Sequence, residues 1–278
     1  MKLFLKTKDF SISGEEFELH YDELLDMLVT SPQPEKLDAY YKSEAYISHT
    51  DADTTLTDKL YQRVKKYSLR KKVALIGRYL KKDNSLLDIG AGTGDFLVAA
   101  KEAGWGIKGV EPSVAARKRA EDKGIELKAD LELLKHEKFG VITLWHVLEH
   151  LPDLELQISK IVTHLEEEAT LIIAVPNFKS KDAEHYEHHW AAYDVPRHLW
   201  HFSRNSIVEL FAKHELKLIE TRPMIFDAFY VALLSEKYKN GNTGFFTLCK
   251  AFGVGLWSNL SAWRTKEYSS LIYILKKD

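Results

Sequence analysis

Apolar residues along the chain recur in two patterns that alternate from about residue 55 onward. Short apolar runs are typical of parallel strands that are buried on both faces of a sheet. These runs are Ser85 to Ile89, Gly106 to Val110, Ile125 to Ala129, Val141 to Trp145 and Leu171 to Val175. Strands that alternate with helices predict an α/β fold whose sheet is covered by helices on both faces.

The segments between and after these runs carry apolar residues at helical spacing. The predicted helices are Asp53 to Lys81, Phe96 to Ala103, Val114 to Lys123 and Asn205 to His214. A strand at Leu216 to Thr221, a helical insertion at Asp227 to Trp263 and a closing strand at Leu271 to Leu275 are predicted to follow.

The N-terminal segment has a different pattern. Phe10 and Ile12 on one side of Gly14, and Phe17 and Leu19 on the other, predict two short strands joined by a turn. We therefore expect an N-terminal extension over residues 1–52, which includes an aromatic segment. We expect one domain over residues 53–278, with a helical cap inserted at about 224–264.

Composition narrows the classes of protein. The 278 residues are 45% hydrophobic and 29% charged, with a formal net charge of −2, so no basic surplus favours nucleic acid as a partner. The single cysteine, Cys249, excludes an internal disulfide and fits a reducing compartment. Met1 to Phe10 lacks the apolar core of a signal peptide, and Gly244 to Trp263 is too interrupted by polar residues to span a membrane. We expect a cytoplasmic protein.

The segment after the first predicted parallel strand is the strongest candidate for a binding loop. Asp88 lies two residues before Gly90-Ala91-Gly92-Thr93-Gly94, and a predicted helix follows. In a dinucleotide-binding fingerprint the third glycine comes three positions after the second, whereas here it comes two positions after. The carboxylate of Asp88 suits a cationic ligand, such as a sulfonium with an amino group, better than a diphosphate.

An acidic residue follows the next strand. Glu111, in Val110-Glu111-Pro112-Ser113, comes close to the spacing at which a carboxylate accepts hydrogen bonds from ribose hydroxyls. A carboxylate at a strand end is also common as a solvated residue. Its place after the glycine loop favours the binding role.

These motifs resemble those of class I S-adenosylmethionine-dependent methyltransferases. The likeness is closest to the bacterial small-molecule group that includes the ubiquinone-biosynthesis O-methyltransferases, and it covers roughly Tyr40 to Arg222 with the closing strand. The resemblance implies a Rossmann-like, mostly parallel sheet of seven strands with one antiparallel edge strand. It also implies S-adenosylmethionine as cofactor and S-adenosylhomocysteine as product.

The same resemblance implies which residues hold the cofactor. Those expected at the methionine end are Asp88, Gly90, Ala91, Gly92 and Gly94. Those expected at the ribose are Glu111 and Pro112, those expected at the adenine are Asp130 and Leu131, and those expected beside the cofactor are Trp145 and His146.

Histidines are the candidate catalytic residues. Methyl transfer from a sulfonium is a direct displacement, so a base is needed only if the acceptor must lose a proton. Our first candidate base is His150, followed by His198 or His201, and we expect Arg197 to lie near the acceptor. A hydrogen-bonded structural role is an equal alternative for each histidine.

A metal site is not expected from the sequence. His185, His188 and His189 have usable spacing, but no companion ligands are evident, and Ser180 to Trp190 resembles a mobile polar insertion. Some relatives carry paired cysteines in a zinc knuckle, and Leu19 to Thr30 has no cysteine.

The function that these observations favour is methyl transfer to a small molecule, at oxygen rather than carbon or nitrogen. A nicotinamide-dependent oxidoreductase would share Glu111 but should have the longer glycine spacing. A non-catalytic S-adenosylmethionine-binding protein would keep the loop without turnover. An RNA or protein methyltransferase is a further alternative that the charge balance disfavours. The aromatic-rich insertion favours an apolar or aromatic acceptor if it covers the site, and carries no such information if it is core or dimer surface.

Overall fold

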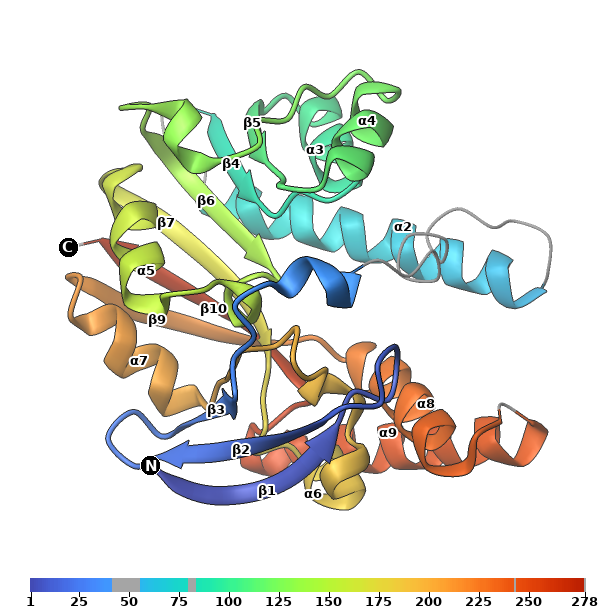
Figure 1. Ribbon diagram of the computed structural model, residues 1–278. Helices are drawn as coiled ribbons and strands as arrows, with labels where there is room; N and C mark the ends of the chain where they lie inside the picture. The colour runs from blue at the N-terminus through green and yellow to red at the C-terminus, as the bar shows by residue number, and fades with distance from the viewer. Residues whose placement is uncertain (42–55, 80–83, 243, 278) are drawn as a thin grey trace.

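The computed structural model describes residues 1–41, 56–79, 84–242 and 244–277. Its central element is a six-stranded sheet in the order β5-β4-β6-β7-β10-β9 (Figure 1). The strands are β4 (Ser85–Ile89), β5 (Gly106–Val110), β6 (Phe139–Trp145), β7 (Leu165–Pro176), β9 (Leu216–Pro223) and β10 (Ser270–Lys277). Neighbouring strands from β5 to β7 are parallel, and β10 is antiparallel to both β7 and β9. The mostly parallel α/β sheet is therefore confirmed.

Two details of the expected sheet differ. The antiparallel strand β10 lies inside the sheet, between β7 and β9, rather than at its edge. The predicted strand Ile125 to Ala129 is reduced to one bridge, Val110 to Lys128. Its backbone still bonds to the end of β5, because Glu111 N–H donates to Lys128 O at 2.9 Å. Six strands are found in the described part of the chain where seven were expected.

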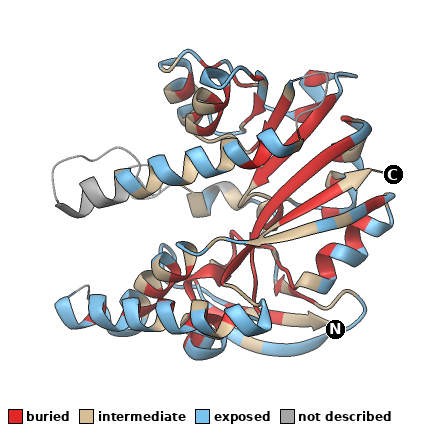
Figure 2. Ribbon diagram, turned by 180° about the vertical axis from the view of Figure 1, so that it is seen from behind, coloured by how far each residue is buried: buried red, intermediate tan, exposed pale blue. Residues whose placement is uncertain are grey.

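Helices cover the two faces of the sheet (Figure 1). One face packs against α2 (Leu56–Ile76) and α3 (Asp95–Glu102), with α4 (Val114–Glu121) beside them. The other face packs against α5 (Leu154–Thr163) and α7 (Arg204–Ala212). Successive residues of a strand point to opposite faces, so Leu86 and Leu87 of β4 are both fully buried but belong to different clusters. This double burial accounts for the unbroken apolar runs in the sequence. Strands β4, β6, β7 and β10 are buried along most of their length (Figure 2).

The N-terminal segment forms a second sheet. Strands β1 (Lys2–Lys8), β2 (Glu16–Asp22) and β3 (Met27–Ser31) pair antiparallel, and β3 also pairs with β8 (Trp200–His201). The expected two-strand hairpin is thus part of a four-stranded sheet, and its first strand ends before Phe10. The predicted boundary at residue 52 falls outside the described residues, as do residues 42–52 of the predicted N-terminal extension.

A third apolar cluster joins this second sheet to the C-terminal helices. It includes Phe17 and Leu28 from the sheet, Trp190 and Tyr193 from the segment after β7, and Ala232. Ala232 belongs to α8 (Asp227–Asn240), which pairs with α9 (Phe245–Thr265) as the predicted helical insertion. Within the described residues no helix has the length and apolarity of a membrane span.

Residues 180–190 are packed rather than mobile and polar, contrary to our expectation. They form α6 (Lys181–Tyr186) and the 3-10 helix η5 (Glu187–His189). Asp182, Tyr186 and Trp190 are buried there, and Asp182 accepts hydrogen bonds from Trp190, Ser258 and Ser269. The segment is therefore a junction between the end of β7 and α9.

Arg197 holds the N-terminal hairpin against the loop after β7. Its side chain is 1% exposed and forms ion pairs with Asp9 at 2.8 Å and Asp194 at 2.7 Å. It also donates to the backbone oxygen of Tyr40 at 3.2 Å. Because its donors are used in this way, Arg197 has a structural role, and its expected place near the acceptor stays a prediction.

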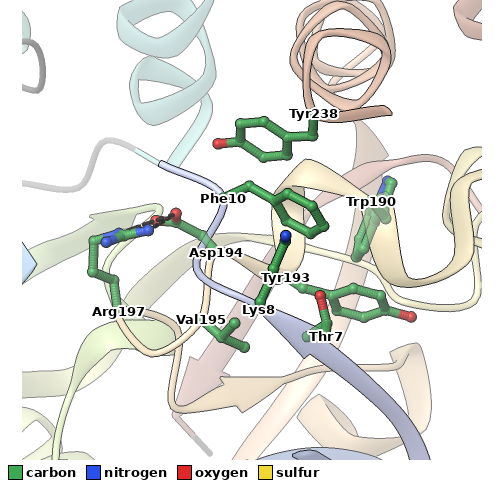
Figure 3. A pocket seen from close by; sticks show the side chains of 9 residues that line it. All are labelled: Thr7, Lys8, Phe10, Trp190, Tyr193, Asp194, Val195, Arg197 and Tyr238. Carbon is green, nitrogen blue, oxygen red and sulfur yellow. Dashed lines mark hydrogen bonds and ion pairs between the residues drawn. The ribbon is translucent and has the colours of Figure 1, made fainter. Parts of the chain in front are cut away.

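A narrow pocket adjoins this ion-pair network (Figure 3). Phe10 lies between Tyr238, with which it stacks at 5.2 Å, and the ammonium of Lys8, which is 5.1 Å from its ring centroid. The cavity volume is about 10 Å³, enough for about one water molecule. It is too small for an acceptor and belongs to the packing of the hairpin.

The hairpin ion pair should contribute strongly to stability. Asp9→Asn leaves the buried guanidinium of Arg197 with one carboxylate partner, so we expect a loss of about 3 kcal/mol in the free energy of unfolding. Urea denaturation measures this. The exposed Glu16 lies on the same hairpin, and Glu16→Gln should change the stability by less than about 0.5 kcal/mol. Equal effects of the two variants would contradict the structural role of Arg197.

Candidate active site at the carboxyl ends of the strands

The loop between β4 and α3 has the backbone conformation that its glycines allow. Gly90, Gly92 and Gly94 have φ values of 70°, 54° and 77°, in the left-handed region. Glycine enters this region without steric cost. The N–H groups of Gly90 and Ala91 both donate to Val110 O, at 2.8 and 3.0 Å, so the loop is tied to the end of β5. Since β4 lies between β5 and β6, the order in which strands are added to the sheet reverses at this point. Sheets of this kind bind ligands at such a switch point.

The three glycines are not equivalent. A Cβ on Gly90 would lie 2.3 Å from Cγ2 of Val147, and one on Gly94 would lie 3.1 Å from Cβ of Ala120. A Cβ on Gly92 would meet no described atom within 4 Å. Gly90 and Gly94 are thus required for packing, while Gly92 presents bare backbone to open space.

Glu111 organises this open side. Its Oε2 accepts from Gly92 N–H at 2.9 Å, and its Oε1 accepts from Ser113 N–H at 2.9 Å. Each carboxylate oxygen can accept more than one hydrogen bond, so Glu111 keeps acceptor capacity on both oxygens. Pro112, directly after it, is exposed at the start of the turn into α4.

Asp88 is a buried carboxyl group two residues before the first glycine of the loop. It is 3% exposed and accepts a hydrogen bond from Thr143 Oγ1 at 2.6 Å. Burial raises the pKa of Asp88 to about 7, although the bond from Thr143 and the ammonium of Lys72 oppose this rise. Asp88 is therefore poised near neutrality between its charged and uncharged forms.

Lys72 on α2 is a site residue that we did not predict. Its ammonium lies 4.3 Å from the ring centroid of Trp145, at the end of β6. Burial lowers the pKa of Lys72, while Asp88 and Asp227 oppose this shift. The sequence contained an indication of this position. Lys72 comes three residues after Leu69, so the two side chains lie on the same, apolar face of α2.

His146 connects the end of β6 to the helical insertion. It has a φ of 57°, an uncommon value for a residue other than glycine. Its Nε2 lies 3.0 Å from Asp227 Oδ2 and its Nδ1 lies 3.3 Å from Glu149 Oε1. Burial alone would lower the pKa of His146, but hydrogen bonds with these two carboxylates outweigh it and raise the pKa to about 10. His146 is an imidazolium at neutral pH, and Asp227 is a second site residue that we missed.

Asp130 and Leu131 lie beyond the bridge to β5. Asp130 is exposed and caps the 3-10 helix η3 (Leu131–Leu134), because its Oδ1 accepts from Glu132 N–H at 2.8 Å. Leu131 is 8% exposed and packs in the core. The contacts of these residues with an adenine ring stay a prediction.

The structure brings the three candidate histidines together. His150 lies in the 3-10 helix η4 (Leu148–His150), and its ring centroid is 4.5 Å from that of His198, which is 6.3 Å from that of His201. Burial and the charge of His198 lower the pKa of His150 to about 4, and burial holds the pKa of His201 well below its usual range. His201 Nε2 lies 3.0 Å from Thr30 Oγ1, which ties it to the second sheet. Their catalytic roles stay predictions.

Comparison with known proteins identifies the family. A family model described as a methyltransferase domain matches residues 61–221, more than half of the chain. The chain belongs to this methyltransferase family. The match covers α2 to β9 and therefore includes the glycine loop, Glu111 and all three histidines, whereas the N-terminal hairpin and the α8–α9 insertion lie outside it. No curated protein sequence matches the chain.

Solved structures share the fold at low sequence identity. Magnesium protoporphyrin IX methyltransferase from Synechocystis PCC 6803, with bound S-adenosylhomocysteine, is 14% identical, with a TM-score of 0.57 over 86% of this chain and 97% of that one. The plantazolicin methyltransferase, also in complex with S-adenosylhomocysteine, is 13% identical, with a TM-score of 0.54 over 87% and 93%. An S-adenosylmethionine-dependent methyltransferase from Thermotoga maritima is 18% identical, with a TM-score of 0.51 over 79% and 96%.

The different surroundings of Gly90 and Gly92 give a first test of the site. Gly92→Ala places a methyl group in open space, at a cost of about 1 kcal/mol for the left-handed backbone, but it should reduce S-adenosylhomocysteine affinity at least tenfold. Gly90→Ala adds a clash with Val147 and should lower stability by about 3 kcal/mol. Thermal unfolding and calorimetric titration measure the two effects. Unchanged affinity in Gly92→Ala would remove the loop from the binding site.

The buried carboxyl group of Asp88 gives a second test. Its pKa is raised on folding, so its ionisation destabilises the fold as the pH rises from about 4 through 7. Asp88→Asn should therefore stabilise the protein by about 3 kcal/mol at pH 8, and this gain should vanish toward pH 4. The same variant should bind S-adenosylhomocysteine at least tenfold more weakly at pH 8. Urea denaturation at both pH values and calorimetry provide the measurements, and a destabilised variant at pH 8 would contradict the raised pKa.

Proposed function

We propose that this methyltransferase uses S-adenosylmethionine as its cofactor and transfers the methyl group to an oxygen atom of a small molecule. The observation that carries the proposal is the exposed backbone at Gly92, which is open on one side and donates its N–H to Glu111, in a loop that follows the buried carboxyl group of Asp88. S-adenosylmethionine carries a sulfonium and an ammonium against one carboxylate. A glycine turn with two acidic side chains at its ends suits such a cation.

The proposed contacts follow the order of the strands. Asp88 and the loop from Gly90 through Ala91 to Gly94 receive the methionine end, and the free acceptor capacity of Glu111, beside Pro112, receives the ribose hydroxyls. Asp130 and Leu131, which follow the bridge to β5, receive the adenine. Trp145 and His146 lie beside the sulfur. In each case the support is the position of the residue at the carboxyl end of the sheet.

The acceptor is proposed to lie next to the histidine cluster. His150 belongs to the same segment as Val147, which packs on Gly90. Displacement at a methyl group requires the acceptor atom in line and in contact with the methyl carbon. A hydroxyl acceptor must also lose its proton, which a site on nitrogen need not do. We therefore propose that the polar side chains of His150 and His198 lie beside this hydroxyl.

A small acceptor fits the remaining observations. With a net charge of −2, the protein has no overall positive charge that would attract nucleic acid. The Synechocystis relative is named for a porphyrin, which supports a small-molecule acceptor by likeness. The aromatic residues of the insertion do not bear on this question, because Phe245, Phe246 and Trp263 are 74%, 87% and 72% exposed. An apolar or aromatic acceptor stays a prediction.

Two measurements test the proposed function. Calorimetric titration should give a dissociation constant of about 10 μM or less for S-adenosylhomocysteine and no binding of NADH. Release of S-adenosylhomocysteine from S-adenosylmethionine, measured against a panel of phenols, catechols and quinols, should then identify an oxygen acceptor. Binding of NADH in place of the nucleoside would favour the oxidoreductase alternative, and binding without turnover on any acceptor class would favour a non-catalytic protein.

A further inference from the structure

Three side chains with metal-ligand chemistry meet at one place beside the proposed acceptor position. Glu149 and His150 come from η4 after β6, and His198 comes from the loop after β7. One ligand atom from each side chain lies within 4.8 Å of the other two. The two segments are held together by their backbones, since Leu199 N–H donates to Glu149 O at 2.8 Å.

Backbone carbonyls lie within hydrogen-bond distance of Nδ1 in both imidazoles. His198 Nδ1 lies 2.8 Å from Ala192 O, and because a carbonyl oxygen only accepts hydrogen bonds, this Nδ1 carries the proton and Nε2 carries the lone pair. His150 Nδ1 lies 3.0 Å from Arg197 O and 3.0 Å from the Tyr41 hydroxyl, and the tautomer that donates to Arg197 O leaves the lone pair on Nε2. A histidine that donates one ring N–H to a backbone carbonyl is the usual arrangement of a metal ligand, because the bond orients the ring and raises the basicity of the other nitrogen.

Glu149 has one ion-pair partner for its buried carboxylate. It is 1% exposed, and neither of its oxygens receives a well-directed hydrogen bond from the described residues. Its one close cationic neighbour in that part of the chain is His146 Nδ1, at 3.3 Å from Oε1. A buried charge costs several kcal/mol unless it is paired or coordinates a metal. The carboxylate of Glu149 therefore has coordinating capacity that the protein does not use.

We propose that Glu149, His150 and His198 bind one divalent first-row transition-metal cation of the Zn²⁺ type. Two imidazoles and one carboxylate favour such a cation over Mg²⁺, which prefers oxygen ligands. Three protein ligands leave a coordination position open, as in catalytic rather than structural zinc sites. Bonds of about 2.1 Å in a tetrahedral site place ligand atoms about 3.4 Å apart, so small side-chain rotations close the cluster around the ion. This departs from our expectation that the chain has no metal site.

The open position gives the cation a role that rests on the proposed function. A hydroxyl oxygen of the acceptor coordinates the cation, which lowers the pKa of the hydroxyl so that its proton passes to water. The oxygen then forms a bond to the methyl carbon while the carbon–sulfur bond breaks and the sulfur keeps the electron pair. The products are the methylated oxygen and S-adenosylhomocysteine. The inferred acceptor class is therefore an alcohol or phenol that can ligate a metal.

The test is metal binding to the full chain, without cofactor or acceptor. After treatment with a chelator, the protein is titrated with Co²⁺, whose visible absorption reports nitrogen and oxygen coordination, and bound metal is counted by mass spectrometry. Wild type should bind one Co²⁺ per chain, and Zn²⁺ but not an equal concentration of Mg²⁺ should displace it. Glu149→Gln and His198→Gln should each weaken binding at least tenfold. The matched control is His185→Gln, because His185 is exposed and lies outside the cluster.

Each outcome decides the proposal. Failure of wild type to bind Co²⁺ at micromolar concentration, or equal binding by wild type and both cluster variants, would overturn it. Loss of binding in His185→Gln would also overturn it, because the metal would then lie elsewhere. If one cluster variant does not fold, the other variant and the wild-type titration still decide. The proposed function is tested separately by S-adenosylhomocysteine titration of the metal-free protein, so that the failure of either idea can be recognised.

Discussion

Buried carboxylates at the carboxyl ends of β4 and β6 need positive partners, and much of the site is arranged around that need. Asp88 faces Lys72 from α2, and Glu149 faces His146, which Asp227 of the insertion also contacts. These contacts place α2, from the N-terminal part of the chain, and α8, from the C-terminal part, at the same edge of the sheet. The charges are close enough to shift one another's pKa values, as functional sites often require.

The N-terminal hairpin contributes to this edge although it lies outside the methyltransferase family match. Asp9 and Asp194 fix the guanidinium of Arg197, and Arg197 O in turn lies 3.0 Å from His150 Nδ1. Thr30 Oγ1 donates to His198 O at 2.6 Å. The hairpin and its sheet therefore support the backbone and side chains of the histidine loop through hydrogen bonds and ion pairs.

Some features of the glycine loop follow from the local sequence, and others depend on packing with distant segments. The loop and Glu111 could be recognised from spacing, because a strand, a run of alternating glycines and a strand-end carboxylate are local features. Which of the glycines are required for packing could not be recognised from spacing. This depends on Val147 and Ala120, which belong to other segments that pack against the loop. The antiparallel strand β10 was predicted, yet its place inside the sheet depends on pairing with β7 and β9 across long stretches of chain.

The sequence by itself determined the α/β class, the strand-to-helix alternation and the candidate residues of the binding loop, since all of these follow from periodicity and short-range spacing. Tertiary structure alone decided which of those residues meet. Lys72 and Asp227 enter the site from elements whose patterns predicted only helices. The guanidinium of Arg197 is held by two carboxylates on separate segments, which its own sequence neighbourhood did not indicate. The cluster of Glu149, His150 and His198 exists because η4 and the loop after β7 are hydrogen-bonded side by side. Contacts between distant segments depend on how the whole chain packs, so they cannot be predicted from a local sequence pattern.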